Sequence, residues 1–167
     1  MAIIGNGDIA KALKEVDRDD LLFFASGVSN SLETDNKQYA REYDLLWKQD
    51  KNMHVVYFSS LCIYYSNSRY AQHKIQMEDN VKFWFNHFTI VRLGNIAWGD
   101  NPHTLINYFR NAIKNKLPYG IKDEYRYIIE KEEFLHWMKM IPKRSCEMNL
   151  SGRMLKVEEI VKQYGYT

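Results

Sequence analysis

The amino-terminal segment constrains the fold most, because a short apolar run leads directly into a glycine turn. Ala2-Ile3-Ile4 precedes Gly5-Asn6-Gly7-Asp8-Ile9-Ala10, and residues 11–16 continue in a pattern typical of a helix. This order predicts a strand, a tight turn and a helix. A glycine turn that only joins two packed elements is one interpretation of the pattern.

The spacing of this turn, G-x-G-x-x-A, also matches a phosphate-binding motif. The first glycine permits a sharp turn, the second lets the backbone approach a pyrophosphate, and the small third residue lets the helix pack closely on the strand. The amino-terminal end of the helix would then point at the phosphates. We predict dinucleotide binding, with contacts from Gly5, Asn6, Gly7, Asp8 and Ile9.

A serine, a tyrosine and a lysine form a second candidate site. Residues 55–60 read as a strand that ends at Ser60, and residues 69–85 read as a helix on which Tyr70 and Lys74 lie one turn apart. A phenol has an ordinary pKa of about 10, but a neighbouring ammonium favours the phenolate and lowers the pKa. The set therefore predicts a carbonyl/alcohol redox site. Because the chain has 12 Tyr, a chance Tyr-x-x-x-Lys is the alternative.

Apolar runs alternate with helical segments along the chain, which predicts a parallel sheet flanked by helices. We therefore expect an α/β, Rossmann-like fold in which residues 1–167 form one domain. No repeat, linker or low-complexity tract interrupts the pattern. The predicted strands are residues 2–4, 21–26, 55–60, 89–93 and 125–129, and the predicted helices are residues 11–16, 33–50, 69–85, 101–116, 131–140 and 157–164.

The composition argues against several classes of protein. The 167 residues carry a formal charge of +2, and Lys and Arg are scattered among Asp and Glu, so we expect no nucleic-acid surface and no membrane association. The five His and two Cys show no metal-ligand spacing, and we predict no metal site. Because neither a secretory leader nor a disulfide framework is apparent, we expect a cytoplasmic protein with reduced thiols.

Seven segments resemble those of one known family and follow one another in that family's order. They are GNGDIA, DLLFFASGVSNS, VVYFSSLCIYY, YAQHKIQME, IVRLGNIAWG, YRYIIEKEEF and CEMNLSGRMLKVEEIV. Together they resemble the extended short-chain dehydrogenase/reductases of the NAD-dependent epimerase/dehydratase type, which modify nucleotide-activated sugars. The resemblance implies an NAD- or NADP-dependent oxidoreductase or epimerase with a nucleotide-sugar substrate.

The resemblance also implies roles for individual residues. Tyr70 as phenolate would take a proton from a sugar hydroxyl while hydride passes to the nicotinamide. Lys74 would lower the pKa of Tyr70 and bind the cofactor ribose, and Ser60 would donate to the developing carbonyl oxygen. The implied catalytic residues are Ser60, Tyr70 and Lys74, the cofactor-binding residues are Gly5, Asn6, Gly7, Asp8, Ile9, Ala25, Ser26, Gly27, Tyr70 and Lys74, and the substrate-binding residues are Asn95, Arg126 and Asn149.

In the resembled family, two helices of each subunit pair across a twofold axis into a four-helix bundle. The corresponding segments here are residues 33–50 and the helix that carries Tyr70 and Lys74. The resemblance therefore implies a homodimer. Its contact face would come from Tyr39, Tyr43, Trp47, Ile75, Val81 and Trp84.

The chain departs from the family in the cofactor half. Between Ala10 and Leu21 there is room for one helix and a turn, whereas the family normally inserts two further strand-helix units that build the adenosine end of the site. No carboxylate stands about 20 positions after the glycine motif, where an acidic residue normally binds the ribose. We therefore expect an abbreviated Rossmann-like domain with weak cofactor binding, in which residues 94–167 form an abbreviated substrate side.

These departures leave two hypotheses about function. The first is the enzyme, and Leu61 and Cys62 favour an epimerase or reductase, because dehydration usually needs an acidic residue just after the catalytic Ser or Thr. The second is a catalytically silent Rossmann-type protein that senses a nucleotide or serves as an interaction subunit in a polysaccharide pathway. The missing adenosine half supports the second hypothesis.

Overall fold

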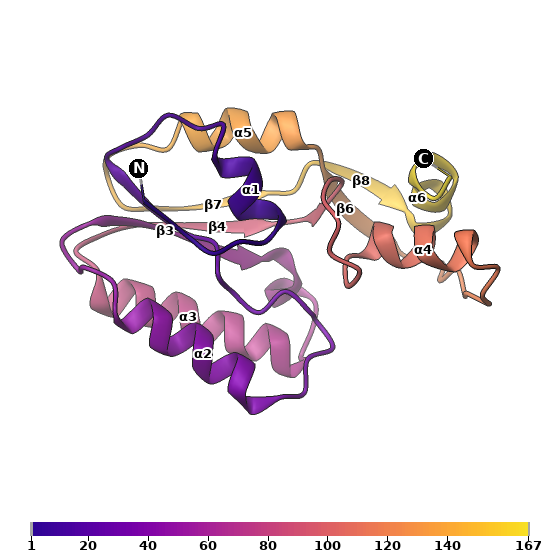
Figure 1. Cartoon of the computed structure of the whole chain (residues 1–167), viewed down its shortest axis with the longest axis horizontal. Helices are drawn as coiled ribbons and strands as arrows, with labels where there is room; N and C mark the ends of the chain where they lie inside the picture. The colour runs from indigo at the N-terminus through magenta and orange to yellow at the C-terminus, as the bar shows by residue number, and fades with distance from the viewer. Residues whose placement is uncertain (1, 167) are drawn as a thin grey trace.

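The computed structural model describes residues 2–166, which form a five-stranded and a three-stranded sheet with helices packed around them (Figure 1). Each predicted strand and helix is present, with ends that differ by a few residues. In chain order the elements are β1 (Ala2–Ile4), α1 (Asp8–Leu13), β2 (Leu21–Phe24), α2 (Asn36–Trp47), β3 (His54–Ser60), the 3-10 helix η1 (Leu61–Tyr64), α3 (Arg69–Trp84), β4 (His87–Leu93), β5 (Asn95–Ile96), α4 (Leu105–Lys114), β6 (Tyr125–Ile129), α5 (Lys131–Lys139), β7 (Cys146–Leu150), β8 (Arg153–Lys156) and α6 (Val157–Tyr164).

The five-stranded sheet is parallel throughout and keeps its strands in chain order, β1-β2-β3-β4-β7. Helices α1 and α5 cover one face, and α2 and α3 cover the other (Figure 1). This arrangement confirms the predicted α/β, Rossmann-like fold. β1 pairs directly with β2, so no strand-helix unit stands between α1 and β2.

Burial on both faces explains why the central strands read as continuous apolar runs. All four residues of β2 are buried. Successive side chains of a strand point to opposite faces. Phe23 therefore packs in the core that contains Phe134 of α5, and Phe24 packs in the core that contains Leu46 of α2 and Met77 of α3.

The helices that follow β1 and β2 lie on opposite faces, although both connections run in the same direction across the sheet. α1 joins β1 to β2 on one face, and α2 joins β2 to β3 on the other. Two such connections have opposite hands, whereas right-handed connections are the rule. In the Rossmann order 3-2-1-4-5-6, the helix after strand 1 leads to strand 2, on the side away from strand 4. If strands 2 and 3 are removed from that order, the helix stays on its own face of the sheet and the chain continues directly to strand 4. This is the position that α1 has between β1 and β2.

The smaller lobe consists of the three-stranded sheet β5-β6-β8 with α4 and α6, and it continues from the carboxyl ends of β4 and β7. β6 is parallel to β5 and antiparallel to β8. Its core contains Ile106, Ile128, Ile160 and Tyr164. The residue pattern did not predict β5, β8 or η1, because elements of two to four residues carry too little periodicity. It also did not predict β7, and only the resemblance of the segment CEMNLSGRMLKVEEIV covered that strand.

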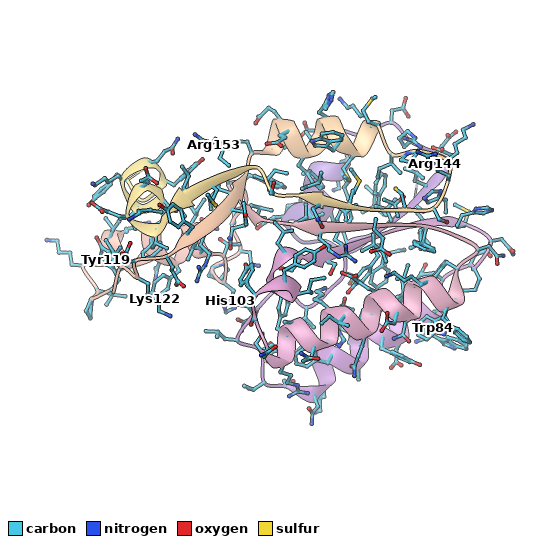
Figure 2. The ribbon with its side chains drawn as sticks, turned by 180° about the vertical axis from the view of Figure 1, so that it is seen from behind. Trp84, His103, Tyr119, Lys122, Arg144 and Arg153 are labelled. Atoms are coloured by element: carbon cyan, nitrogen blue, oxygen red, sulfur yellow. The ribbon has the colours of Figure 1, made fainter. Side chains whose placement is uncertain are left out.

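The labelled side chains show how the two parts of the molecule are placed (Figure 2). Trp84 lies on the outer side of α3, at the end opposite the smaller lobe, whereas Tyr119 and Lys122 lie on that lobe. His103 lies between the lobe and the five-stranded sheet.

None of the helices within residues 2–166 has the length and apolar character needed to cross a membrane.

Gly5 holds the turn after β1 against the end of β2. Its φ of +126° belongs to a region that favours glycine, and a Cβ atom there would lie 2.2 Å from the carbonyl oxygen of Ala25. The N–H of Ala25 in turn donates to the carbonyl oxygen of Ile4 at 2.8 Å. Glycine at position 5 is therefore required by the packing of the turn itself.

Candidate active site

A cleft of about 1230 Å³ opens at the carboxyl ends of β1, β2, β3 and β4, beside the smaller lobe. In parallel α/β sheets, ligands bind outside this edge. The cleft brings together most of the residues that the sequence indicated, whereas Gly5 and Asn149 are not among those that line it. The predicted residues that line it are Asn6, Gly7, Asp8, Ile9, Ala25, Ser26, Gly27, Ser60, Tyr70, Lys74, Asn95 and Arg126.

Gly7 presents an open backbone at the start of α1. It is the N-cap of the helix, and no atom lies within 4 Å of the position that a Cβ atom would take. The neighbouring Asp8 is buried, and its Oδ2 accepts a hydrogen bond from the N–H of Asn101 at 2.9 Å. The turn is therefore accessible at Gly7, while the Asp8 carboxylate holds the loop between β5 and α4.

At the end of β2 the backbone passes closely over a buried lysine. A Cβ atom at Gly27 would lie 2.6 Å from Lys74 Nζ and 3.0 Å from Glu42 Oε1, so any larger residue would displace one of them. Ser26 is held from the side by Arg41, whose Nη1 donates to Ser26 Oγ at 3.0 Å. Gly27 thus covers Lys74 at the floor of the cleft.

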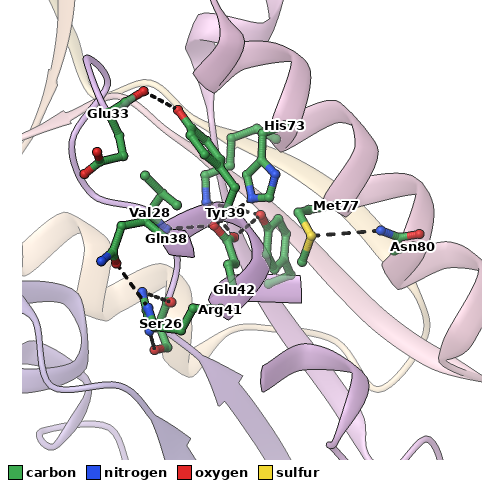
Figure 3. A network of polar contacts seen from close by, with 12 residues as sticks. Ser26, Val28, Glu33, Gln38, Tyr39, Arg41, Glu42, His73, Met77 and Asn80 are labelled. Carbon is green, nitrogen blue, oxygen red and sulfur yellow. Dashed lines mark hydrogen bonds and ion pairs between the residues drawn. The ribbon is translucent and has the colours of Figure 1, made fainter. Parts of the chain in front are cut away.

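Glu42 of α2 is fully buried at the centre of a polar network (Figure 3). Its Oε1 accepts hydrogen bonds from Tyr57 Oη at 2.6 Å and from Lys74 Nζ at 2.9 Å. Its Oε2 accepts from the N–H of Val28 at 2.7 Å and from His73 Nε2 at 3.0 Å. Burial alone would raise the pKa of Glu42, but the charge of Lys74 and these hydrogen bonds outweigh it and hold the pKa well below its usual range.

Lys74 directs its ammonium into the protein. Only 2% of the residue is exposed, and Nζ donates to Glu42 Oε1 at 2.9 Å, to Tyr57 Oη at 3.1 Å and to the carbonyl oxygen of Phe58 at 3.4 Å. Within residues 2–166 no hydrogen bond joins Lys74 to Tyr70, whose ring centroid lies 5.7 Å from Nζ. The ammonium therefore serves Glu42 and Tyr57 in this arrangement.

Tyr70 lines the cleft but is not activated. Burial raises the pKa of its phenol, and the neighbouring Cys62 and Glu42 raise it further. The prediction that Lys74 lowers the pKa of Tyr70 is therefore wrong for this arrangement, because the Glu42 carboxylate binds and offsets the ammonium. Near neutral pH Tyr70 is a neutral phenol.

Ser60 ends β3 as predicted and lines the cleft. Its Oγ accepts a hydrogen bond from the N–H of Cys62 at 3.2 Å and so caps η1. A hydroxyl has one donor in addition to its acceptor positions, so this contact leaves the Ser60 O–H able to donate. The Oγ of the adjacent Ser59 is buried and has no hydrogen-bond partner within residues 2–166.

The three predicted substrate residues do not converge. Asn95 and Arg126 line the cleft, and Arg126 Nη2 pairs with Glu124 Oε1 at 2.6 Å. Asn149 lies on β7 outside the cleft, and its Oδ1 accepts a hydrogen bond from Tyr64 Oη at 3.0 Å. Asn149 therefore has a partner in the fold itself and does not line the cleft with the other two.

The sequence-based prediction missed Glu42. The residue falls on the buried stripe of α2, three positions after Tyr39 and four before Leu46. A carboxylate on the buried face of an amphipathic helix needs a buried partner, and that position was the available signal. Arg41 and Lys122, which also line the cleft, are exposed and gave no comparable signal.

No family model and no curated protein matches the sequence. Solved structures match the fold. The Bordetella bronchiseptica enzyme WbmH in complex with NAD+ aligns with a TM-score of 0.67 at 16% identity, over 84% of this chain and 55% of its own. WbmG from the same organism, in complex with NAD and UDP, aligns with a TM-score of 0.62 at 12% identity, over 87% of this chain and 56% of its own. The Thermus thermophilus UDP-glucose 4-epimerase complex with NAD aligns with a TM-score of 0.62 at 15% identity, over 91% of this chain and 62% of its own.

This chain thus spans a little over half the length of each of these three proteins. At such low sequence identity the likeness shows a shared fold. All three were solved with NAD or NAD+ bound.

The network around Glu42 predicts a specific acid sensitivity. In the unfolded chain a Glu takes up a proton near pH 4.3, whereas the folded protein keeps Glu42 ionised to lower pH because its pKa is lowered. Ionised Glu42 therefore stabilises the folded protein fully at pH values above the pKa of a Glu in the unfolded chain. This stabilisation is lost progressively as the pH falls below about 5. We expect the free energy of unfolding to decrease there by up to about 1.4 kcal/mol per pH unit from this one group.

Urea unfolding between about pH 3 and pH 7 measures this slope. Glu42→Gln should have a shallower dependence on pH than the unsubstituted protein. Glu132→Gln, which changes an exposed carboxylate in the first turn of α5, should not. Equal slopes for all three proteins would contradict the assigned role of Glu42.

Proposed function

We propose that this protein binds NAD or NADP in the cleft and acts as an oxidoreductase or epimerase on a nucleotide-activated sugar. The observation that carries the proposal is that the glycine turn after β1, Gly27 after β2, Ser60 at the end of β3 and Tyr70 on α3 all line one cleft. Proteins of the same fold that hold NAD give it further support.

The charge of the cleft suits an anionic ligand. Cationic side chains outnumber carboxylates among the lining residues. An excess of one sign of charge in a cleft raises the local concentration of oppositely charged ligands, such as dinucleotides and nucleotide sugars. The lining cations are Lys11, Arg41, Lys74, Lys122 and Arg126, and the lining carboxylates are Asp8 and Asp100.

The residues of the cleft suggest how the proposed reaction would proceed. NAD supplies hydride chemistry when bound. Tyr70 would exchange a proton with the substrate oxygen, and the O–H of Ser60 would donate a hydrogen bond to the same oxygen as its charge changes. Leu61 and Cys62 follow Ser60 without a carboxylate, which favours epimerisation or reduction over dehydration.

A second candidate function is a catalytically silent protein that senses a nucleotide or serves as an interaction subunit in a polysaccharide pathway. One observation favours it: Lys74 is bound by Glu42, and Tyr70 remains a neutral phenol. Both candidates share the ligand-binding cleft, and they differ in whether Tyr70 takes part in a reaction. For either candidate we propose a cytoplasmic location.

We also propose a homodimer that forms through α2 and α3. Tyr43 and Trp47 are 43% and 55% exposed, and both pack edge-on against Trp84 with ring centroids 5.0 Å apart. The expected face needs a correction, because Val81 is fully buried and Tyr39 is 7% exposed, so neither can contribute much to a contact between subunits.

A titration with NAD, NADH, NADP and NADPH tests the proposed ligand. We expect calorimetry to give micromolar binding of at least one form. Gly7→Val should weaken nucleotide binding about tenfold or more. The added side chain would fill the open space beside Gly7, through which the ligand would approach the backbone of the turn. Gly120→Val is the matched control, because Gly120 also faces open space but does not line the cleft. Absence of binding for all four nucleotides at millimolar concentration would exclude the proposed redox function.

Tyr70→Phe separates the two candidate functions. Under the enzyme hypothesis the variant should lose turnover of nucleotide sugars by at least about a hundredfold, because general acid-base catalysis typically contributes that much. Its affinity for the nucleotide should fall much less than its turnover, because the aromatic ring that lines the cleft is kept. Turnover that survives in Tyr70→Phe would show that Tyr70 is not the proton-transfer group.

Sedimentation equilibrium tests the dimer. The chain mass is 19.9 kDa, and we expect a species of twice that mass. Trp47→Asp should shift the protein toward the monomer, because it places a charge among the exposed aromatic side chains. Met154→Asp, on the exposed face of the smaller sheet, should not. A monomer at all concentrations would overturn this proposal.

A further inference from the structure

We propose that Glu42 is a positioning residue whose carboxylate holds the Lys74 ammonium against Tyr57, so that Tyr70 enters the proposed reaction as a neutral phenol that donates a proton. This inference rests on the proposed function for its meaning in catalysis. The arrangement of Glu42, Lys74 and Tyr57 stands independently of it.

The contacts of Glu42 identify it as an ionised group with no freedom to move. An ionised carboxylate offers about four acceptor positions, and four donors fill them: Tyr57 Oη, Lys74 Nζ, the N–H of Val28 and His73 Nε2. These donors come from β3, from α3 and from the segment after β2. Because an ionised carboxylate only accepts, all four partners must donate to it, and a neutral carboxyl would leave one of them unpaired.

The contacts of Lys74 leave nothing for Tyr70. An ammonium has three N–H donors, and Glu42, Tyr57 and the carbonyl oxygen of Phe58 account for all of them. Tyr57, Lys74 and Glu42 all contact one another, because the O–H of Tyr57 donates to the same Glu42 oxygen that Lys74 contacts. Lys74 could therefore reach Tyr70 only by giving up a contact with this group, which keeps the positive charge paired with Glu42.

Among residues 2–166, the groups that act most strongly on Tyr70 include no cation that could replace Lys74. A thiol, two further phenols and the Glu42 carboxylate act on Tyr70 electrostatically, and burial adds to their effect. Each of these favours the protonated phenol. The groups that face Tyr70 are Cys62 from η1, Tyr65 from the segment after η1, Tyr39 and Glu42 from α2, and Lys74 from α3, which Glu42 neutralises.

This state of Tyr70 sets the form in which it would enter the proposed chemistry. Carbonyl reduction would need a hydride donor, which a reduced nicotinamide supplies when bound. As the carbonyl carbon gained the hydride, the Tyr70 O–H bond would break and its proton would move to the carbonyl oxygen, leaving an alcohol, an oxidised nicotinamide and the Tyr70 phenolate. Alcohol oxidation would have to start from the phenolate, whereas carbonyl reduction starts from the phenol, the form that this arrangement favours near neutral pH.

The state of Tyr70 can be read directly by NMR, without cofactor or turnover. In protein labelled with 13C at tyrosine Cζ, the Tyr70 resonance is assigned by its loss in Tyr70→Phe and followed as pH rises. We expect it to remain a phenol beyond the pH at which an ordinary phenol ionises, about 10. In Glu42→Gln it should ionise at a pH lower by about one unit or more, because Lys74 is then free to act on it.

Glu78→Gln is the matched control, because Glu78 is also a buried carboxylate, lies on α3, pairs with Arg92 and is not among the groups that act most strongly on Tyr70. It should leave the Tyr70 titration unchanged. The proposal is overturned if Glu42→Gln and Glu78→Gln behave alike. If Glu42→Gln does not fold, the unsubstituted protein decides: ionisation of Tyr70 at or below the ordinary phenol value overturns the proposal, and a higher value supports it. None of these results depends on whether NAD binds.

Discussion

The buried carboxylate of Glu42 is the interaction on which the organisation of the candidate site depends. A buried charge without a partner destabilises a protein by several kcal/mol, so Glu42 requires the donors that surround it. Those donors join α2 to β3, to α3 and to the segment after β2. The same contacts bring Gly27 over Lys74, and a side chain at position 27 would collide with both charged groups. The floor of the cleft is therefore built around one ion pair.

The order of the strands explains how a short chain forms a cleft at one edge of its sheet. The strands of the larger sheet are all parallel, so their carboxyl ends lie along one edge, and those of β1, β2, β3 and β4 border the cleft even though β1 pairs directly with β2. The position of α1 on the face opposite α2 is that of a Rossmann chain without strands 2 and 3. Longer proteins of the same fold align with this chain over a little more than half of their length.

Much of the fold could be predicted from the sequence because its main elements have strong periodicity. The fully buried β2 and the glycine turn around Gly5 were both visible as patterns. The smaller sheet was only partly visible, since β5 and β8 are very short. The site was predicted in outline, but the state of Tyr70 was not. A Tyr-x-x-x-Lys spacing shows which residues are near each other on a helix, whereas the partner of Lys74 comes from a different helix, far away in sequence.

Amide chemical-shift mapping of 15N-labelled protein titrated with NAD tests whether the cleft at the strand ends holds a dinucleotide, as we propose. We expect perturbations at residues 5–9, 25–28 and 60–74, which surround the cleft, and little change in α5 and α6, which do not line it. Perturbations confined to α5 and α6, or no perturbation at millimolar NAD, would contradict this proposal.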